Sequence, residues 1–206
     1  GSDTSLRTLT VWPDTSIADV LFLPFDTLLV NAAVPNLNVD STGAVDLVAL
    51  PPGKSYRAVT GRPVVSVLAD EDRARFTALP DSLDPRIAAL AQSVIGNATS
   101  PREKAKAVEA YFLNEYEYRV GIHVPRNEDP LTFFLLEKPA AHCEYFAAGA
   151  AVLLRLGGVP CRYVTGFVAA ERSPFGDYWI ARNKDAHAWV EAWDDAAKRW
   201  VTVEAT

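Results

Sequence analysis

The first third of the chain alternates short apolar runs with turn residues. The runs are rich in β-branched and aromatic residues, and the breaks between them contain proline, glycine and asparagine, which predicts short strands joined by turns. The predicted strands are residues 6–10, 20–25, 28–34, 45–50 and 56–67. Their spacing favours a small β-sandwich or sheet. These strands contain no group of catalytic residues, so we expect the chemistry to lie later in the chain.

The middle of the chain changes to helical spacing. Ser100-Pro101-Arg102-Glu103 combines an N-cap serine, a proline in the first turn and a capping-box glutamate, and predicts a helix from 101 to about 115. A helix is also predicted over 143–156, because apolar residues recur at i, i+3, i+4, i+7 and Gly157-Gly158 follow. Further helical segments are expected at 85–95 and 129–136. The stretches 70–75 and 80–85 are predicted to be a linker.

The last part of the chain returns to strand patterns. The predicted strands are 161–168, 178–182, 185–193 and 199–204. Helices followed by an antiparallel sheet indicate the α+β class. We therefore expect two domains, a β-rich N-terminal subdomain at 1–78 and a helix-and-sheet core at 79–206.

Composition narrows the function classes. The chain has 206 residues and a net charge of −6, which argues against a nucleic-acid partner. No apolar run approaches the about 18 residues needed to span a bilayer. Two cysteines give neither a disulfide framework nor a zinc pattern, and we assign no cofactor and no metal. Because Gly1-Ser2 is typical of cloning and methionine is lacking, we expect a fragment of a longer protein.

Cys143 is the candidate nucleophile. It falls in the first turn of its predicted helix, where the positive end of the helix dipole stabilises a thiolate, and its backbone N–H is a candidate donor to an oxyanion. The alternative for a free cysteine is a small buried apolar residue.

His187 gains a partner from the predicted hairpin. A symmetric turn at 194–197 places Glu191 opposite Trp200 and His187 opposite Glu204, on one face of the sheet. Directly opposed side chains have Cβ atoms roughly 5 Å apart, so imidazole and carboxylate can meet. Cys143, His187 and Glu204 would then form a nucleophile, a base and an orienting acid.

Other acids fit less well. Glu191 lies roughly 13 Å along the strand from His187, and Asp185 lies on the same face at about 7 Å. Asp194 and Asp195 are predicted to lie farther away, in the turn.

Four segments resemble the transglutaminase-like superfamily, whose core is papain-like. They are 143–147 (CEYFA), 155–167 (RLGGVPCRYVTGF), 185–191 (DAHAWVE) and 200–206 (WVTVEAT). The resemblance covers roughly 80–206 and implies that Cys143, His187 and Glu204 occupy the triad positions. Three residues differ from the usual pattern: Glu204 replaces aspartate, Ala141 glycine and Cys161 alanine. We expect Cys161 to be a buried strand residue.

The resemblance also suggests auxiliary residues and a cellular context. Tyr118 or Tyr116, in the upstream aromatic segment, would supply a second oxyanion donor. Independently of the resemblance, we expect Trp179 to flank a substrate groove. The β-rich first part followed by this core resembles bacterial membrane-anchored members. It implies an extracytoplasmic domain, periplasmic or at the cell surface, that meets the membrane only through segments outside this sequence.

The expected reaction is attack of the Cys143 thiolate on a glutamine carboxamide or peptide carbonyl, giving a thioester. An amine or water would then resolve the thioester. The implied partners are proteins or peptides with glutamine side chains, and amine acceptors. Two alternatives remain open: a cysteine protease or amidase of the same fold, and an inactive domain that binds peptides or cell-wall material.

Overall fold

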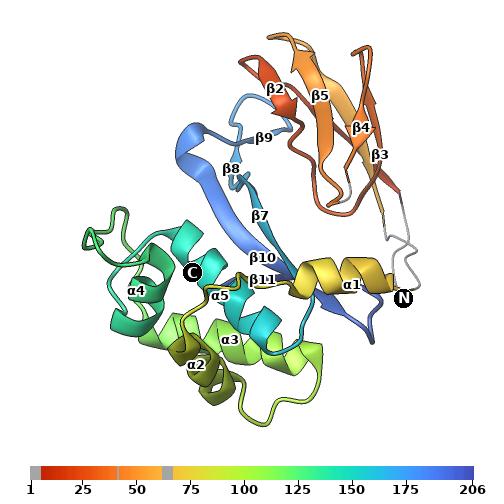
Figure 1. Ribbon diagram of the computed structural model, residues 1–206. Helices are drawn as coiled ribbons and strands as arrows, with labels where there is room; N and C mark the ends of the chain where they lie inside the picture. Colours follow the sequence, from red (N-terminus) through yellow and green to blue (C-terminus); the bar gives the residue numbers. More distant parts are fainter. Residues whose placement is uncertain (1–5, 41, 62–66) are drawn as a thin grey trace. The chain divides into compact units, whose positions relative to one another are not determined.

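The computed structural model describes residues 6–40, 42–61 and 67–206. The chain divides into two compact units, 1–64 and 65–206, which are described separately. The first is built of strands, and the second combines five helices with an antiparallel sheet (Figure 1). The predicted α+β class is confirmed.

The first unit contains two three-stranded sheets. One has the order β1-β6-β3 and the other β2-β5-β4. The strands are β1 (Arg7–Val11), β2 (Ile17–Val20), β3 (Thr27–Ala32), β4 (Asn38–Val39), β5 (Val45–Leu50) and β6 (Tyr56–Thr60). Tyr56 of one sheet and Leu47 of the other share one apolar core, as the predicted β-sandwich requires.

Two predicted strands differ from the structure. The strand expected at 20–25 lies earlier, as β2, and ends at Val20. Asp19 takes a φ of 70° where the pairing of β2 with β5 shifts register, and Pro24 lacks the N–H that a ladder needs. The strand expected at 56–67 ends at Thr60 as β6, and its residues 62–66 lie outside the described residues.

The second unit packs helices on a sheet of order β11-β10-β7. Its helices are α1 (Asp70–Thr77), α2 (Pro85–Ile95), α3 (Pro101–Glu115), α4 (Pro130–Glu137) and α5 (Cys143–Leu156). Its strands are β7 (Cys161–Phe167), β8 (Glu171–Arg172), β9 (Trp179–Ile180), β10 (Ala186–Asp194) and β11 (Arg199–Val203). α5 is buried along most of its length, and its apolar residues share a core with Ala188 and Val190 of β10.

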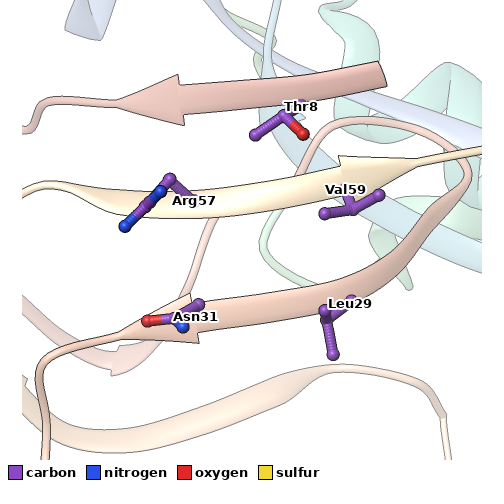
Figure 2. Close-up of a pocket in the computed structure, with 5 residues that line it drawn as sticks. All are labelled: Thr8, Leu29, Asn31, Arg57 and Val59. Atoms are coloured by element: carbon purple, nitrogen blue, oxygen red, sulfur yellow. The ribbon is translucent and has the colours of Figure 1, made fainter. Parts of the chain in front are cut away.

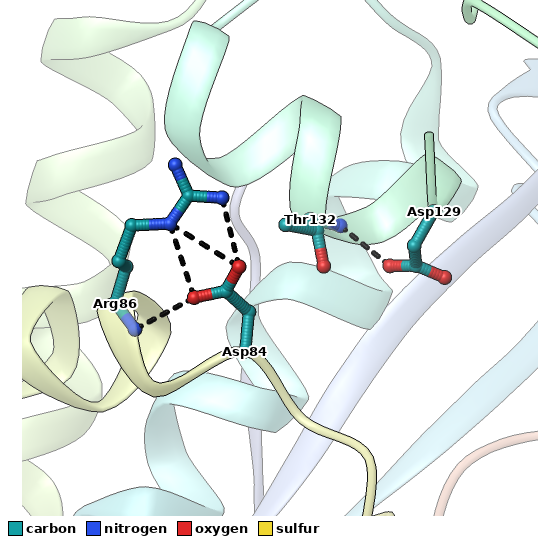
Figure 3. A network of polar contacts seen from close by, with 4 residues as sticks. All are labelled: Asp84, Arg86, Asp129 and Thr132. Atoms are coloured by element: carbon teal, nitrogen blue, oxygen red, sulfur yellow. Dashed lines mark hydrogen bonds and ion pairs between the residues drawn. The ribbon is translucent and has the colours of Figure 1, made fainter. Parts of the chain in front are cut away.

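Side-chain caps begin three of these helices, as predicted for α3. Asp84 accepts the N–H of Arg86 at 2.8 Å, and Asp129 accepts that of Thr132 at 2.8 Å (Figure 3). Ser100 and Glu103 form the reciprocal capping box of α3. Each cap satisfies an N–H that the helix itself leaves unpaired.

The segment predicted as a linker is partly helical. α1 occupies Asp70–Thr77, with acidic residues in its first turn, where the helix dipole favours negative charge. Phe76 is buried and meets the ring of Trp200 edge-on at 5.0 Å, beside Trp193. This anchor belongs to the second compact unit. The domain boundary at residue 78 stays a prediction.

Candidate active site

Cys143 is the first residue of α5, and His142 is its N-cap. The His142 side chain makes no capping hydrogen bond; its Nε2 instead contacts Glu144 Oε2 at 3.2 Å. Cys143 is 8% exposed, so its thiol lies just beneath the surface. The His142 side chain does not cap α5, and the positive end of the helix dipole favours negative charge at the position of Cys143.

Tyr118 lies beside Cys143 because its segment runs along the residues that precede α5. Arg119 N–H donates to Ala141 O at 2.7 Å, and Ala141 N–H donates to Glu117 O at 3.2 Å. The pKa of Tyr118 is raised, first by desolvation and then by the charge of Cys143 and a hydrogen bond to its side chain. Of the two predicted tyrosines, this is the one next to Cys143.

Tyr116 has a different position. Its hydroxyl donates to Leu135 O at 2.9 Å, and its ring packs against Phe112, Phe134 and Phe146 at 4.9, 4.8 and 6.0 Å. Burial raises its pKa. Since its hydroxyl is already bonded to a backbone carbonyl inside the aromatic core, Tyr116 is a structural residue.

His187 and Glu204 form a hydrogen-bonded pair. His187 Nε2 donates to Glu204 Oε2 at 3.0 Å, and the two side chains are 17% and 44% exposed. The other carboxylate oxygen, Oε1, accepts from the Thr206 hydroxyl at 2.7 Å and from the Thr206 N–H at 3.3 Å. The predicted contact is confirmed. It engages Nε2, so Nδ1 is the ring nitrogen left for a second partner.

The strand register that led to this contact was wrong by two residues. Trp193 pairs with Trp200 and Glu191 with Thr202, whereas we expected Glu191 opposite Trp200. The strand continues to Asp194, whose Oδ1 accepts the N–H groups of Ala196 and Ala197, and Lys198 closes the loop with φ 53°. A shift of two preserves the face of each side chain, so Glu204 reaches His187 diagonally.

The rival acids are engaged elsewhere. Glu191 forms an ion pair with Arg162 at 2.6 Å. Asp185 accepts the N–H of Arg182 at 2.8 Å. Asp195 pairs with Arg73 at 2.6 Å, and Asp194 closes the hairpin loop. Glu204 is thus the carboxylate that the structure brings to His187.

α5 and β7 run in opposite directions along the sheet. Cys161, at the start of β7, donates its thiol hydrogen to Ala151 O at 3.4 Å. Tyr163, two residues further on, has a pKa raised by burial and then by the charges of Glu144 and Cys143 at the start of α5. The end of β7 pairs Gly166 with His187. The start of α5 and the His187 end of β10 therefore lie at the same end of the sheet.

The two remaining predicted residues differ in burial: Cys161 is buried and Trp179 is exposed. Cys161 is fully buried and free, and burial raises its pKa to about 11, as expected of a buried strand residue. Trp179 is 61% exposed in the β8–β9 hairpin, where it pairs with Arg172, and its role at a substrate groove stays a prediction.

Neither a metal-binding cluster nor a membrane-spanning helix occurs among the described residues. Across residues 6–40, 42–61 and 67–206, no three His, Cys, Asp or Glu side chains gather as a metal ion requires. No helix in these ranges has the length and apolarity to cross a bilayer. A pocket on the first unit is lined by Thr8, Leu29, Asn31, Arg57 and Val59, and these residues include no cysteine, histidine or carboxylate (Figure 2).

A model of the Transglutaminase-like superfamily matches residues 88–205, which include Cys143, His187 and Glu204. An uncharacterised protein, YebA of Bacillus subtilis, is 34% identical over 139 residues, 64% of this chain and 19% of YebA. A protein-glutamine gamma-glutamyltransferase of Pseudomonas aeruginosa is 31% identical over 135 residues, 65% of this chain and 20% of that protein. The match spans about a fifth of the length of these curated relatives.

The fold is similar to that of a solved periplasmic domain. The crystal structure of this domain of TgpA from Pseudomonas aeruginosa superposes with a TM-score of 0.77 at 24% identity. The match covers 97% of this chain and 68% of that one. It therefore includes both units of the chain, each of which has a counterpart there.

Proposed function

Because this chain belongs to the transglutaminase-like superfamily, whose members are cysteine enzymes, we propose that it is an acyltransferase working through a thioester. Cys143 is the nucleophile, His187 the base and Glu204 the acid that orients the base. The observation that carries the proposal is the hydrogen bond of 3.0 Å between His187 and Glu204, at the end of the sheet where α5 begins with Cys143.

The first half of the reaction forms the thioester. His187 takes the Cys143 proton, and the thiolate attacks the carbonyl carbon of a glutamine side chain. The backbone N–H of Cys143 and the hydroxyl of Tyr118 are the groups that stabilise the oxyanion. When the C–N bond breaks, His187 returns the proton to the departing nitrogen, so ammonia leaves and the acyl group stays on sulfur.

The second half releases the acyl group. A primary amine attacks the thioester carbonyl and His187 accepts a proton from the amine. As the C–S bond breaks, His187 passes this proton to sulfur, which gives a substituted amide (an isopeptide when the amine is a lysine side chain) and the Cys143 thiol. Glu204 stabilises the imidazolium in both halves. Water can replace the amine, so the balance between transfer and hydrolysis depends on how well the site admits an amine and excludes water.

The name of one relative supports the proposed substrate class. The similar protein from Pseudomonas aeruginosa carries the name protein-glutamine gamma-glutamyltransferase, which supports glutamine-bearing proteins as acyl donors and primary amines as acceptors. The exposed Trp179 is proposed to flank the donor groove.

The proposed location is extracytoplasmic, in a bacterial membrane protein whose membrane segments lie outside this sequence. The fold shared with the periplasmic domain of TgpA supports it. Fusion of this chain to a reporter enzyme active only outside the cytoplasm, in the full-length parent, tests the location. A fusion protein that is produced in full but shows no reporter activity contradicts it.

We further propose that residues 79–206 contain all the catalytic groups and that 1–78 contributes no member of the triad. Chains starting at residue 65 and at residue 79 separate chemistry from stability. Both should keep the reactivity of Cys143, but the shorter one should be less stable, since it lacks Phe76 against Trp200. Loss of Cys143 reactivity in a folded 79–206 chain contradicts this division.

The decisive assay combines casein, a labelled primary amine and the wild-type chain, with Cys143→Ala beside it. Incorporation of label that requires Cys143 supports transfer. Cleavage of the casein backbone that requires Cys143 makes the protein a protease, and release of ammonia without incorporation makes it an amidase. Absence of every Cys143-dependent reaction over many donors would indicate a binding domain.

A further inference from the structure

A carboxylate on α3 contacts the strand end that bears Glu204. Glu109 Oε1 accepts the backbone N–H of Glu204 at 2.9 Å, across 95 residues of sequence. The β10–β11 ladder ends at the pair Val190–Val203, so this N–H lies one residue beyond the last paired position. The Glu109 side chain thus supplies the acceptor that a neighbouring strand would otherwise provide.

Glu109 stands at the edge of the buried stripe of α3. Ala105, Val108 and Phe112 of this stripe are buried, and Glu109 is partly buried next to them. A hydrogen bond from a backbone N–H to a carboxylate is charge-assisted and roughly twice as strong as one between neutral groups. The contact therefore fixes the backbone of Glu204 more firmly than an ordinary loop contact would.

Thr206 completes the arrangement from the other side. Its hydroxyl and its N–H both donate to Glu204 Oε1, and Oε2 accepts from His187 Nε2. Glu204 is therefore held at its backbone by Glu109 and at one carboxylate oxygen by Thr206. The remaining oxygen is presented to the imidazole.

We propose that Glu109 is a positioning residue of the catalytic pair. It holds the backbone of Glu204 so that the carboxylate meets Nε2, and through this bond it sets the orientation and the tautomer of His187. The inference rests on the proposed function. It differs from a role in α3–β11 packing alone, because it requires the effect of Glu109 on the reaction to pass through Glu204.

Two substitutions separate the hydrogen bond from packing. Glu109→Met keeps a side chain of similar length and helix propensity but removes the acceptor. Glu109→Gln removes the charge but keeps an oxygen that accepts the same N–H. Glu115→Ala is the matched control, a glutamate of the same helix whose partner is the surface residue Lys138.

The measurement is kcat and KM for amine incorporation into a short glutamine peptide, below the melting temperature of every variant. Glu109→Met should lower kcat by about tenfold to a hundredfold with KM for the peptide unchanged, since a misplacement of about 1 Å costs this much. Glu109→Gln should retain most of the rate, and Glu115→Ala all of it. In a Glu204→Gln background, Glu109→Met should have little further effect on kcat, because residues acting as one unit are not additive.

The inference is overturned if Glu109→Met has wild-type kcat, if Glu109→Gln is as impaired as Glu109→Met, or if the loss adds in full to that of Glu204→Gln. Failure of the proposed function has a different signature, namely wild-type protein without Cys143-dependent turnover. In that event the rate of Cys143 alkylation against pH still tests Glu109. A profile of Glu109→Met that matches Glu204→Gln supports the positioning role, and a wild-type profile refutes it.

Discussion

The start of α5 and the start of β7 each contain a cysteine, and both residues are largely buried, at 8% and 0% exposed. Cys143 lies at a helix N-terminus beside Tyr118, at the end of the sheet where His187 stands. Cys161 lies in a strand within the apolar core, its thiol bonded to Ala151 O and its pKa raised to about 11 by burial. The exposed fraction of the two cysteines is nearly the same and does not distinguish them. The two thiols differ in the groups that surround them.

The largest expected difference between the two cysteines is in turnover, when each sulfur is removed in turn. Cys143→Ala should abolish turnover, a loss that reaches about a millionfold when a nucleophile is removed. Cys161→Ala should keep the rate of wild type, because its sulfur touches no group of the site. The measurement is labelled-amine incorporation with folding checked by circular dichroism. Equal losses in both variants would remove the distinction between the two regions.

The next test concerns the base that we propose for Cys143, the pair of His187 and Glu204. Glu204→Gln leaves an amide at Oε2 that no longer fixes the tautomer of His187, and kcat should fall by about 100- to 10,000-fold. Glu204→Asp keeps the charge one methylene shorter and should lie between this variant and wild type. Steady-state kinetics on a glutamine peptide measure both. Wild-type kcat in Glu204→Gln would exclude the pair from the chemistry.

Alkylation compares the two thiols within one molecule. With a pKa of about 11, Cys161 has roughly one thiolate in ten thousand at pH 7, and its burial blocks the reagent as well. Brief treatment with iodoacetamide should therefore label Cys143 at least about a hundredfold faster. Peptide mass mapping gives the ratio, and unfolded protein, in which both sites should react alike, is the control. Preferential labelling of Cys161 would reverse the comparison.

The smallest effect is on alkaline stability. The pKa of Cys161 is raised from 9.0 to about 11 in the folded protein, so folding favours the protonated thiol. This contribution is complete below pH 9 and is lost as pH rises towards 11. The melting temperature of wild type should therefore fall more steeply over this range than that of Cys161→Ala. Tyrosine ionisation contributes equally to both, and parallel slopes would contradict the prediction.

Local chemistry made much of the fold predictable. The capping box at Ser100 and Glu103 predicted α3, and Gly157-Gly158 predicted the end of α5. These signals depend on contacts between residues only a few positions apart, so the residues that make each contact can be read directly from the sequence. α1 was missed because its anchoring residue, Phe76, is defined by rings more than 100 positions away, at Trp193 and Trp200.

The site was predictable only in part. The shared face of His187 and Glu204 followed from strand alternation, but the register depended on Lys198 adopting a left-handed conformation, which lysine does not signal. Tyr116 and Tyr118 are two residues apart, and two distant contacts distinguish them: Tyr118 forms a β-bridge with Ala141, and the Tyr116 hydroxyl donates to Leu135 O. The contact of Glu109 with Glu204 has no local signal, although Thr206, two residues after Glu204, fits a short-range side-chain motif.

The four-residue loop 195–198 makes this site sensitive to the parity of insertions. If the loop keeps its four residues, a change of two residues in this region moves Glu204 along the sheet and leaves it on the face of His187. Under the same condition, a change of one residue turns Glu204 to the opposite face, towards the core, and places a charge where Val203 is now buried. An insertion that the loop absorbs leaves the register unchanged, so only insertions or deletions that enter the strands must be even to keep Glu204 on the face of His187.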